Sequence, residues 1–235
     1  MTRSRRQDFH QTIRSYVIRS GRLTTSQRNA IDQHWADYVI EYRDAPLRME
    51  DLFAAGSCLH VEIGFGMGDS LLQLAMQEPA NNYIGIEVHK PGVGKLLHGI
   101  AEHQLTNLRI ICHDARAVLQ NCFDANSIDK LLVLFPDPWP KKRHHKRRLL
   151  QAEFAELAAS RLKAGGCIHL ATDWQAYAEH MMTVLENTRS LENTEGSNCY
   201  WDNPVRPATK FERRGQILGH GVWDLNFRKR LPGPL

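Results

Sequence analysis

Residues 59–69 read Leu-His-Val-Glu-Ile-Gly-Phe-Gly-Met-Gly-Asp. A short apolar stretch, residues 58–63, precedes three glycines at alternating positions, and a helical pattern over 69–77 follows at once. Short apolar stretches of this kind are typical of buried strands, and glycine lets a backbone pass close to a ligand. The segment therefore predicts a strand, a tight turn and a helix, the unit at which open parallel sheets bind their ligands.

The same alternation of strands and helices continues along the chain. Further strands are expected over residues 83–88, 108–112, 131–135 and 167–171, and further helices over 95–104, 115–121, 149–162 and 174–185. Gly165 and Gly166 are expected to close the helix over 149–162. Because the strands are apolar throughout, the pattern predicts an α/β fold with a mostly parallel sheet and helices on both faces. Short aromatic-containing segments after Tyr200 predict antiparallel strands at one sheet edge.

Charge is distributed unevenly along the chain of 235 residues, whose formal net charge is only +4. Residues 1–30 contain seven arginines and one acid, and residues 141–148 contain six Lys or Arg, two His and no acid. Such stretches predict a polyanionic partner at one face, the alternative being a solvated surface without a partner. We divide the chain into a basic N-terminal arm with helices, residues 1–56, and an α/β domain, residues 57–235.

The cysteine and hydropathy patterns indicate the cellular compartment in which we expect the protein. The five cysteines form no C-x-x-C pair, so we expect neither a disulfide framework nor a metal site, and a reducing, cytoplasmic location. No apolar stretch approaches the ~20 residues needed to cross a bilayer, so no membrane partner is expected. The basic start lacks the apolar stretch of a secretory signal, although an Arg-rich organelle transit peptide is an alternative.

The glycine spacing separates two classes of cofactor site. A dinucleotide site of the form G-x-G-x-x-G would require glycine where Asp69 stands, which disfavours a nicotinamide dehydrogenase. Gly64, Gly66 and Gly68 instead form G-x-G-x-G. This spacing suits S-adenosylmethionine, which has no pyrophosphate but has a carboxylate to place near helical N–H groups. The alternative is a tight turn without a ligand.

Acidic side chains stand at three successive expected strands. Glu62 lies in the first strand, Glu87 near the end of the second, and Asp114 just after the third. A carboxylate at Glu87 can accept hydrogen bonds from both ribose hydroxyls of an adenosine, and Asp114 can meet the adenine amine. Each acid could instead be a helix cap or turn residue. Their combination beside a glycine loop favours the cofactor site.

After the fourth strand the chain reads Phe-Pro-Asp-Pro-Trp-Pro over residues 135–140. Pro136 and Pro138 fix two φ angles and remove two donors, so the chain should leave the strand stiff and extended. This would point Asp137 outward beside the methyl donor, with Trp139 offering a flat face to a base. The cofactor site requires Glu87 and Asp137 to face one common cleft.

In these motifs the chain resembles the bacterial tRNA (guanine-N7-)-methyltransferases, which methylate guanine 46 of the tRNA variable loop. The likeness covers almost the whole chain, with segments at residues 13–17, 21–24, 61–68, 135–144, 171–174 and 209–215. It implies a Rossmann-like class I methyltransferase fold with a seven-stranded sheet. It also implies S-adenosylmethionine as cofactor, tRNA as partner and 7-methylguanosine as product, in a monomer or homodimer.

The resemblance also implies three groups of site residues. The cofactor-binding group is Glu62, Gly64, Gly66, Gly68, Glu87, Asp114, Ala115 and Asp137, and Asp137 is also the catalytic carboxylate. The substrate-binding group is Lys141, Asp173, Thr209, Lys210, Phe211 and Glu212. The RNA-binding group is Arg143, His144, His145, Lys146, Arg147 and Arg148. Asp173 could instead cap the following helix, and Glu212 could pair with Arg213 or Arg214.

Two other functions remain open from the residues. A nucleic-acid methyltransferase acting on an exocyclic amine shares an Asp-Pro-aromatic motif, but the second proline of its Asp/Asn-Pro-Pro-aromatic pattern is missing after Pro138. An RNA-binding module that has lost catalysis is the other alternative. The intact glycine loop and the acids at the strand ends argue against it.

Overall fold

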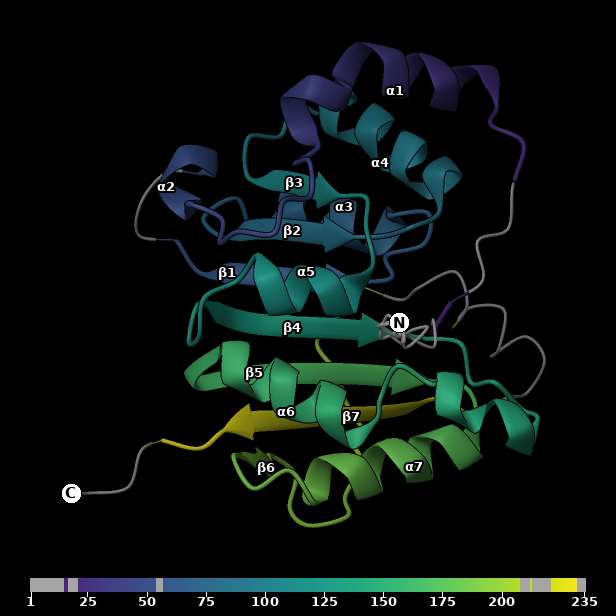
Figure 1. Cartoon of the computed structure of the whole chain (residues 1–235), viewed down its shortest axis with the longest axis vertical. Coiled ribbons are helices and arrows are strands. Elements are labelled where there is room, and N and C mark those ends of the chain that lie inside the picture. The colour runs from purple at the N-terminus through teal and green to yellow at the C-terminus, as the bar shows by residue number, and fades with distance from the viewer. Residues whose placement is uncertain (1–14, 17–20, 54–56, 208–211, 213–220, 232–235) are drawn as a thin grey trace, which may run out of the picture.

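The computed structural model describes residues 15–16, 21–53, 57–207, 212 and 221–231. Seven strands form one sheet in the order β3-β2-β1-β4-β5-β7-β6 (Figure 1). The parallel strands are β1 (Leu59–Ile63), β2 (Asn82–Ile86), β3 (Leu108–Ile111), β4 (Ile128–Leu134) and β5 (Leu162–Thr172). Strand β7 (Trp223–Lys229) is antiparallel to β5 and to β6 (Leu191–Asn193). The predicted fold class is confirmed.

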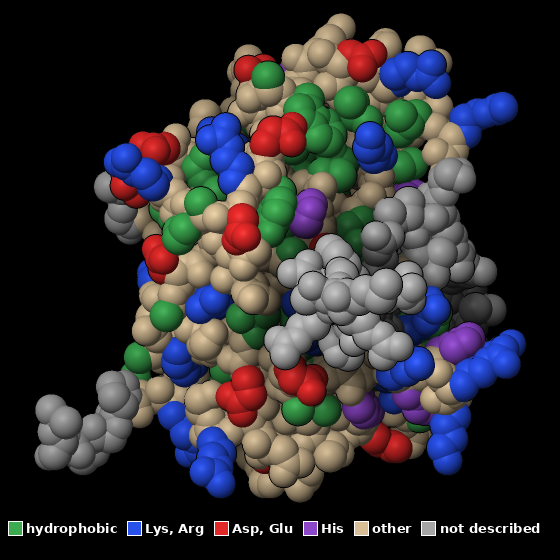
Figure 2. Space-filling view, in the orientation of Figure 1, with side chains coloured by type: hydrophobic (Ala, Val, Ile, Leu, Met, Phe, Trp, Pro, Cys, Tyr) green, Lys and Arg blue, Asp and Glu red, His purple; other side chains and the backbone are tan. Residues whose placement is uncertain are grey.

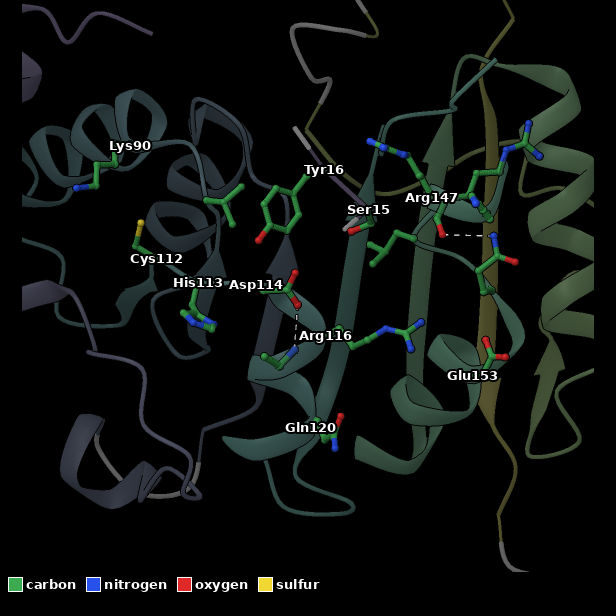
Figure 3. Close-up of a pocket in the computed structure, with 16 residues that line it drawn as sticks. Ser15, Tyr16, Lys90, Cys112, His113, Asp114, Arg116, Gln120, Arg147 and Glu153 are labelled. Carbon is green, nitrogen blue, oxygen red and sulfur yellow. Dashed lines mark hydrogen bonds between the residues drawn. The ribbon is translucent and has the colours of Figure 1, made fainter. Parts of the chain in front are cut away.

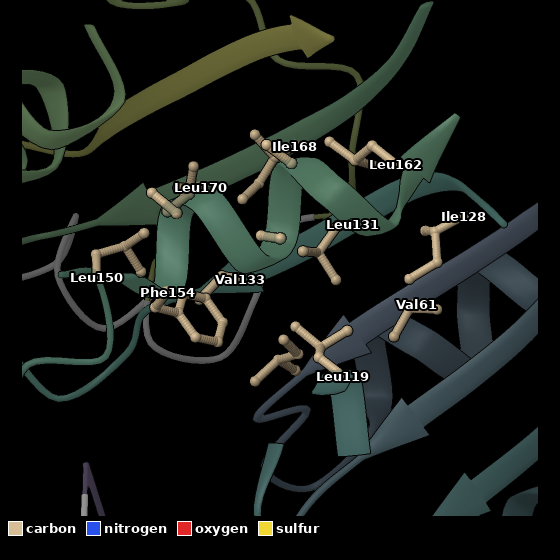
Figure 4. Packing of buried hydrophobic residues seen from close by; sticks show 14 of the residues in the cluster. Val61, Leu119, Ile128, Leu131, Val133, Leu150, Phe154, Leu162, Ile168 and Leu170 are labelled. Carbon is tan, nitrogen blue, oxygen red and sulfur yellow. The ribbon is translucent and has the colours of Figure 1, made fainter. Parts of the chain in front are cut away.

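Helices cover both faces of the sheet. On one face pack α5 (Ala115–Asn121), α6 (Ala152–Arg161) and α7 (Gln175–Glu186), and on the other α3 (Asp69–Gln77) and α4 (Lys90–Glu102). Leu131 and Val133 of β4 belong to the first core, where Phe154 of α6 lies beside Val133 (Figure 4). Leu132 and the residues alternating with it face the opposite way. Burial on both faces explains why the strands carry continuous apolar sequence.

Residues 21–53 pack against the β3 side of the sheet. Helix α1 (Thr25–Tyr38) begins with a capping box, in which the Thr24 hydroxyl accepts from Gln27 N and the Gln27 side chain accepts from Thr24 N. The helix lies alongside α4 (Figure 1). Beyond it, Val39 forms a parallel bridge with Ile110 of β3, and the short α2 (Met49–Leu52) follows. These residues thereby extend the α/β core.

Three of the differences from the predicted boundaries are the largest. Helix α4 begins at Lys90 instead of residue 95, because Pro91 suits a first helical turn, where its missing N–H is not needed. Gly165 and Gly166 do not close α6 but lie inside β5, where the register against β4 shifts and Gly165 has a φ of +79°. Strand β6 precedes Tyr200, whereas both antiparallel strands were expected after it.

The strand order reverses direction between β1 and β4. In an open parallel sheet this switch point leaves a crevice at the carboxyl ends of the two strands, because their connections depart to opposite faces. The glycine loop follows β1 and the Pro-rich segment follows β4, so the topology brings both predicted motifs to one place. Among the described residues, no helix has the length and apolar character that a membrane span requires.

Candidate active site

A cavity of about 420 Å³ opens at the carboxyl ends of β1, β2 and β4. Its lining includes Gly64 and Gly66 from the β1–α3 loop, Glu87 after β2, Ala115 at the start of α5, and Asp137 after β4. Glu87 and Asp137 therefore face the same cavity. Five of the eight residues predicted to hold the cofactor meet here, whereas Glu62, Gly68 and Asp114 are not among the residues that line this cavity.

The three glycines of the loop all have positive φ angles, 72° at Gly64, 59° at Gly66 and 79° at Gly68. At Gly64 and Gly66 a Cβ atom would meet nothing within 4 Å, so these two positions open onto free space. At Gly68 a Cβ would lie 2.9 Å from the Cβ of Leu96. The first two glycines thus keep the backbone accessible from the cavity, whereas the third lets α3 begin close to α4.

Glu87 holds the glycine loop against the end of β2. Its Oε2 accepts from Gly66 N at 2.9 Å, and its Oε1 accepts from Val88 N at 2.6 Å and His89 N at 3.0 Å. An ionised carboxylate has about four acceptor positions, so roughly one is left for a ligand hydroxyl. Binding both ribose hydroxyls would require one backbone bond to give way.

Glu62 lies in β1 with only 3% of its surface exposed, and its Oε2 has no hydrogen-bond partner among the described residues. Burial, and then the neighbouring Glu87, raise the pKa of this carboxyl to about 8, although Arg206 opposes the shift. A buried carboxylate oxygen without a donor is costly, and a cationic ligand would relieve that cost. S-adenosylmethionine carries an ammonium and a sulfonium group, so these residues fit it.

Asp114 serves as a helix cap and also lines open space. Its Oδ1 accepts from Ala117 N at 3.1 Å, which makes it the N-cap of α5. It also lines a hollow of about 690 Å³ beside the cavity (Figure 3). The hollow and the cavity share Ser15, Tyr16, Val88, His113 and Leu149 in their lining. The sequence did not predict that Ser15 and Tyr16 would reach this position.

Asp137 is exposed and lies between two strained residues. Phe135 has a φ of 52° and Trp139 a φ of 44°, values that are rare for side chains other than glycine. Trp139 Nε1 donates to the Ser15 carbonyl at 3.1 Å, and the guanidinium of Arg147 lies 5.0 Å from the centre of its ring. Arg147 thus covers one face of the Trp139 ring, so the flat face predicted for a base would have to be the other one.

The predicted RNA-binding stretch forms a short 3-10 helix, η1 (Lys142–Arg147), at the edge of the molecule. In Figure 2, Lys, Arg and His side chains gather there, beyond the carboxyl ends of β4 and β5. Arg148 differs from the others, being only 4% exposed. Its Nε donates to the Pro138 carbonyl at 2.9 Å, and its guanidinium lies 4.8 Å from the Tyr177 ring centre. We therefore remove Arg148 from the RNA-binding group.

The predicted substrate-binding residues are spread over two places. Lys141 is exposed immediately before η1. Asp173 lines a third, open hollow of about 530 Å³ together with Trp174 and Trp223. The alternative in which Asp173 caps the following helix is wrong, because Trp174 is the N-cap and no side chain caps that helix. Thr209, Lys210 and Phe211 lie outside the described residues.

Glu212 is joined to the sheet by a residue that the sequence analysis missed, Arg206. The Arg206 side chain is 1% exposed and forms an ion pair with Glu212, whereas the alternative partners Arg213 and Arg214 lie outside the described residues. Arg206 Nε and Nη2 also contact the two carboxylate oxygens of Asp224 in β7 at 2.7 and 2.8 Å. Its guanidinium lies 5.6 Å from the Phe135 ring centre. Arg206 thus links β7, Glu212 and the turn that carries Asp137.

A buried histidine completes this network. His169 Nε2 lies 2.6 Å from Asp224 Oδ1, and the His169 side chain is fully buried. Although burial opposes the shift, hydrogen bonds from Arg206 and His169 hold the pKa of Asp224 below its ordinary value. The position of Arg206 between Pro204 and Pro207 was the available signal in the sequence, because a stiff segment presents a charged side chain in a fixed direction.

Comparison with known proteins identifies the family. The Methyltransf_4 family, described as "Putative methyltransferase", matches residues 57–225. The chain is 49% identical to the tRNA (guanine-N(7)-)-methyltransferase of Pseudomonas fluorescens (strain Pf0-1), covering 94% of this chain and 92% of that one. It is 47% identical to the enzyme of that name from Pasteurella multocida (strain Pm70), covering 94% and 88%.

Solved structures agree on the fold. The 16S rRNA methyltransferase KamB superposes with a TM-score of 0.57 at 14% sequence identity, covering 82% of this chain and 99% of that one. At this identity the similarity bears on the fold alone. The resemblance predicted from the sequence motifs is confirmed by the two close relatives and the family match. The chain belongs to the tRNA (guanine-N(7)-)-methyltransferase family.

Proposed function

We propose that this protein transfers the methyl group of S-adenosylmethionine to N7 of guanine 46 in the variable loop of tRNA, giving 7-methylguanosine. One observation carries the proposal. In a chain of this family, Glu87 and Asp137 line one cavity at the switch point of the sheet, and the basic η1 (Lys142–Arg147) begins five residues after Asp137. A methyl donor in that cavity would be presented to the side of the protein that attracts RNA.

The donor is held by the residues around the glycine loop. The ionised form of Glu62 offers an unpartnered oxygen to a cationic group, and Glu87 offers its remaining acceptor position to a ribose hydroxyl. Asp114 and Ala115 bound the adenine end, since both stand at the carboxyl end of β3. Gly64 and Gly66 keep the loop close to the ligand without side chains in the way, and Gly68 lets α3 begin close to α4.

Guanine N7 carries an in-plane lone pair, so it attacks a methyl carbon without losing a proton first. S-adenosylmethionine, when bound, supplies a methyl group activated by its sulfonium charge. Asp137 accepts a hydrogen bond from the guanine and favours the positive charge that develops on the purine ring. Catalysis therefore depends on positioning and on electrostatic stabilisation more than on proton transfer.

The tRNA is recognised by two groups of side chains. Arg143, His144, His145, Lys146 and Arg147 of η1 contact phosphates. Lys141, Asp173 and Glu212, with Thr209, Lys210 and Phe211, contact the target nucleotide. Within the described residues the Asp173 side chain forms no hydrogen bond or ion pair, and it lines open space, which leaves its carboxylate available to a substrate donor.

The test is the product formed on a tRNA transcript. Purified protein is incubated with unmodified tRNA and S-adenosylmethionine, and the nucleosides are analysed by mass spectrometry. We expect 7-methylguanosine, and none from a transcript carrying adenine at position 46. An N2- or N6-methylated nucleoside would instead favour a methyltransferase acting on exocyclic amines. Tight tRNA binding without donor binding in calorimetry would favour an RNA-binding module without catalysis.

A further inference from the structure

The hollow of about 690 Å³ beside the donor cavity has two walls that face each other (Figure 3). One wall is α5, which contributes Arg116 and Gln120. The other wall runs from the end of η1 into α6 and includes Arg147 and Glu153. In Figure 3 the Arg116 side chain reaches from α5 toward the side where Arg147 and Glu153 lie. The hollow therefore lies between α5 and the segment that runs from η1 into α6.

The methyl donor accounts for only one end of this hollow. Asp114 and His113, at the end of β3, are the residues near which the adenine would lie. Arg116, Gln120 and Glu153 lie further out. A neutral adenosine base has no need of cations, so the charge at this outer end needs another explanation.

Positive charge is in excess around the hollow. Lys90, Arg116, Lys146, Arg147 and the buried Arg148 line it, and within the described residues none of the five forms an ion pair. The acids in the lining are Asp114, one of whose oxygens is used in capping α5, and Glu153. Uncompensated cations on the walls of a concave surface raise the local concentration of anions. A ligand with negative charge along its length would compensate them.

We infer that this hollow holds the sugar–phosphate backbone of the tRNA strand next to the target nucleotide, with Arg116 as the phosphate contact on the α5 wall. The inference rests on the proposed function and extends it to residues outside the basic stretch. The hollow adjoins the cavity where the target guanine must arrive, and its opposite wall carries Lys146 and Arg147 of η1. A strand passing through is therefore contacted from both sides.

The test compares Arg116→Gln with Arg189→Gln, an exposed arginine in the turn between α7 and β6. Glutamine keeps the helix propensity of arginine but removes the charge. We expect Arg116→Gln to weaken tRNA binding on the order of 3- to 10-fold at low salt. The slope of log K against log salt should become shallower by about 0.7 to 0.9, the value of one phosphate contact. Arg189→Gln should change neither quantity, and donor affinity without tRNA should be unchanged in both variants.

A substitution of opposite sign gives an independent measurement. Glu153→Gln removes the acid from the wall opposite Arg116. It should strengthen tRNA binding about two- to fivefold, because the Glu153 carboxylate no longer repels the phosphate. If Arg116→Gln leaves tRNA affinity unchanged, or weakens donor binding instead, the hollow is not an RNA passage. These experiments measure binding and do not depend on methyl transfer. If the wild-type protein formed no 7-methylguanosine, that result would contradict the proposed function but not the binding of RNA in this hollow.

Discussion

The carboxyl group of Glu62 lies inside the sheet, and burial raises its pKa to about 8. The folded state favours the neutral form of Glu62. The contribution of this residue to the free energy of unfolding is therefore complete below the ordinary pKa near 4.5 and is lost as the pH rises toward 8. We expect the free energy of unfolding of the wild type, relative to Glu62→Gln, to fall by a few kcal/mol between pH 5 and 8. Urea denaturation at several pH values measures this difference.

Glu62→Gln also serves as the reference for ligand binding. A cationic donor favours the ionised carboxylate, so saturating S-adenosylmethionine should flatten the pH dependence of the wild type and leave that of the variant unchanged. A stability difference that stays constant from pH 5 to 8 would mean that Glu62 ionises as an ordinary carboxyl group, and the argument from its burial would then be wrong.

Asp137 can be tested separately from RNA binding, because it is a single exposed acid beside a cationic helix. Asp137→Ala should lower the single-turnover rate of methyl transfer about 100-fold or more, since it removes charge stabilisation at the reacting purine. The dissociation constant for tRNA should change much less. Asp137→Asn keeps an acceptor oxygen, so its methyl-transfer rate should lie between those of the wild type and Asp137→Ala. A wild-type rate in Asp137→Ala would exclude this carboxylate from catalysis.

Single residues show where sequence reasoning reaches its limit. The stretch 141–148 is uniformly basic in sequence, yet Arg148 is buried while Arg143 and Lys146 are exposed. The difference comes from Pro138 and Tyr177, which the fold brings to Arg148 from other segments. Periodicity within the stretch contains no information about those partners, whereas the acids at strand ends were predictable because parallel strands end at one edge.

The first turn of helix α4 lies in close contact with the glycine loop. A Cβ atom at Gly92 would lie 1.8 Å from the carbonyl oxygen of Gly66. Gly92→Ala should therefore displace the loop and weaken donor binding on the order of tenfold, with little effect on tRNA affinity, because the Gly66 carbonyl must move away from the new Cβ atom. Calorimetry with S-adenosylmethionine measures it.

Gly94→Ala is the matched control in the same helix. Its Cβ would meet the backbone oxygen of Gln27 in α1 at 2.8 Å, so it should loosen the packing of α1 and lower thermal stability without altering donor affinity. Equal donor affinity in Gly92→Ala and the wild type would show that the loop tolerates the displacement.

The link between β7 and the Asp137 turn depends on Arg206. Arg206→Met leaves Asp224 buried without its cation and should cost about 3 to 5 kcal/mol of unfolding free energy. Asp224→Asn in the same background should cost much less than it does alone, because the two side chains act as one pair. Chemical denaturation of the two single variants and the double variant measures the coupling, and additive losses would contradict it.

Elements were predictable to different degrees for physical reasons. The strand over residues 131–135 is entirely Leu, Val and Phe, and burial on both faces makes such a pattern unambiguous. Gly165 and Gly166 looked like the end of a helix, but they lie in β5 because Gly166 passes close to the backbone of Ile128 and Asp129. That contact depends on the register between β4 and β5, which local sequence does not specify.

For the whole molecule, association with tRNA should depend on charge at one face. Replacing Arg143 and Lys146 with Gln should weaken binding and make the slope of log K against log salt shallower by about 1.4 to 1.8, the value of two phosphate contacts. Arg148→Gln should leave the slope unchanged and lower stability instead, since it removes a buried donor from the Pro138 carbonyl. Salt titrations of binding distinguish them, and a shallower slope in Arg148→Gln would restore that residue to the RNA-binding group.

The overall topology was predictable because strands alternate with helices and a glycine loop marks the switch point. The docking of α1 on α4 was not, because it depends on a close approach between Gly94 and Gln27 that leaves no periodic pattern. The N-terminal segment was therefore expected as an arm, without a position against the sheet.

The bridge between Val39 and Ile110 has a consequence for how copies of this protein meet. It covers part of the outer side of β3, and at the opposite border β6 is only three residues long. Unpaired backbone groups along a border strand are what recruit another chain into a continuous sheet. Among the described residues neither border offers a long row of them, which disfavours the addition of a further strand from another copy at either border.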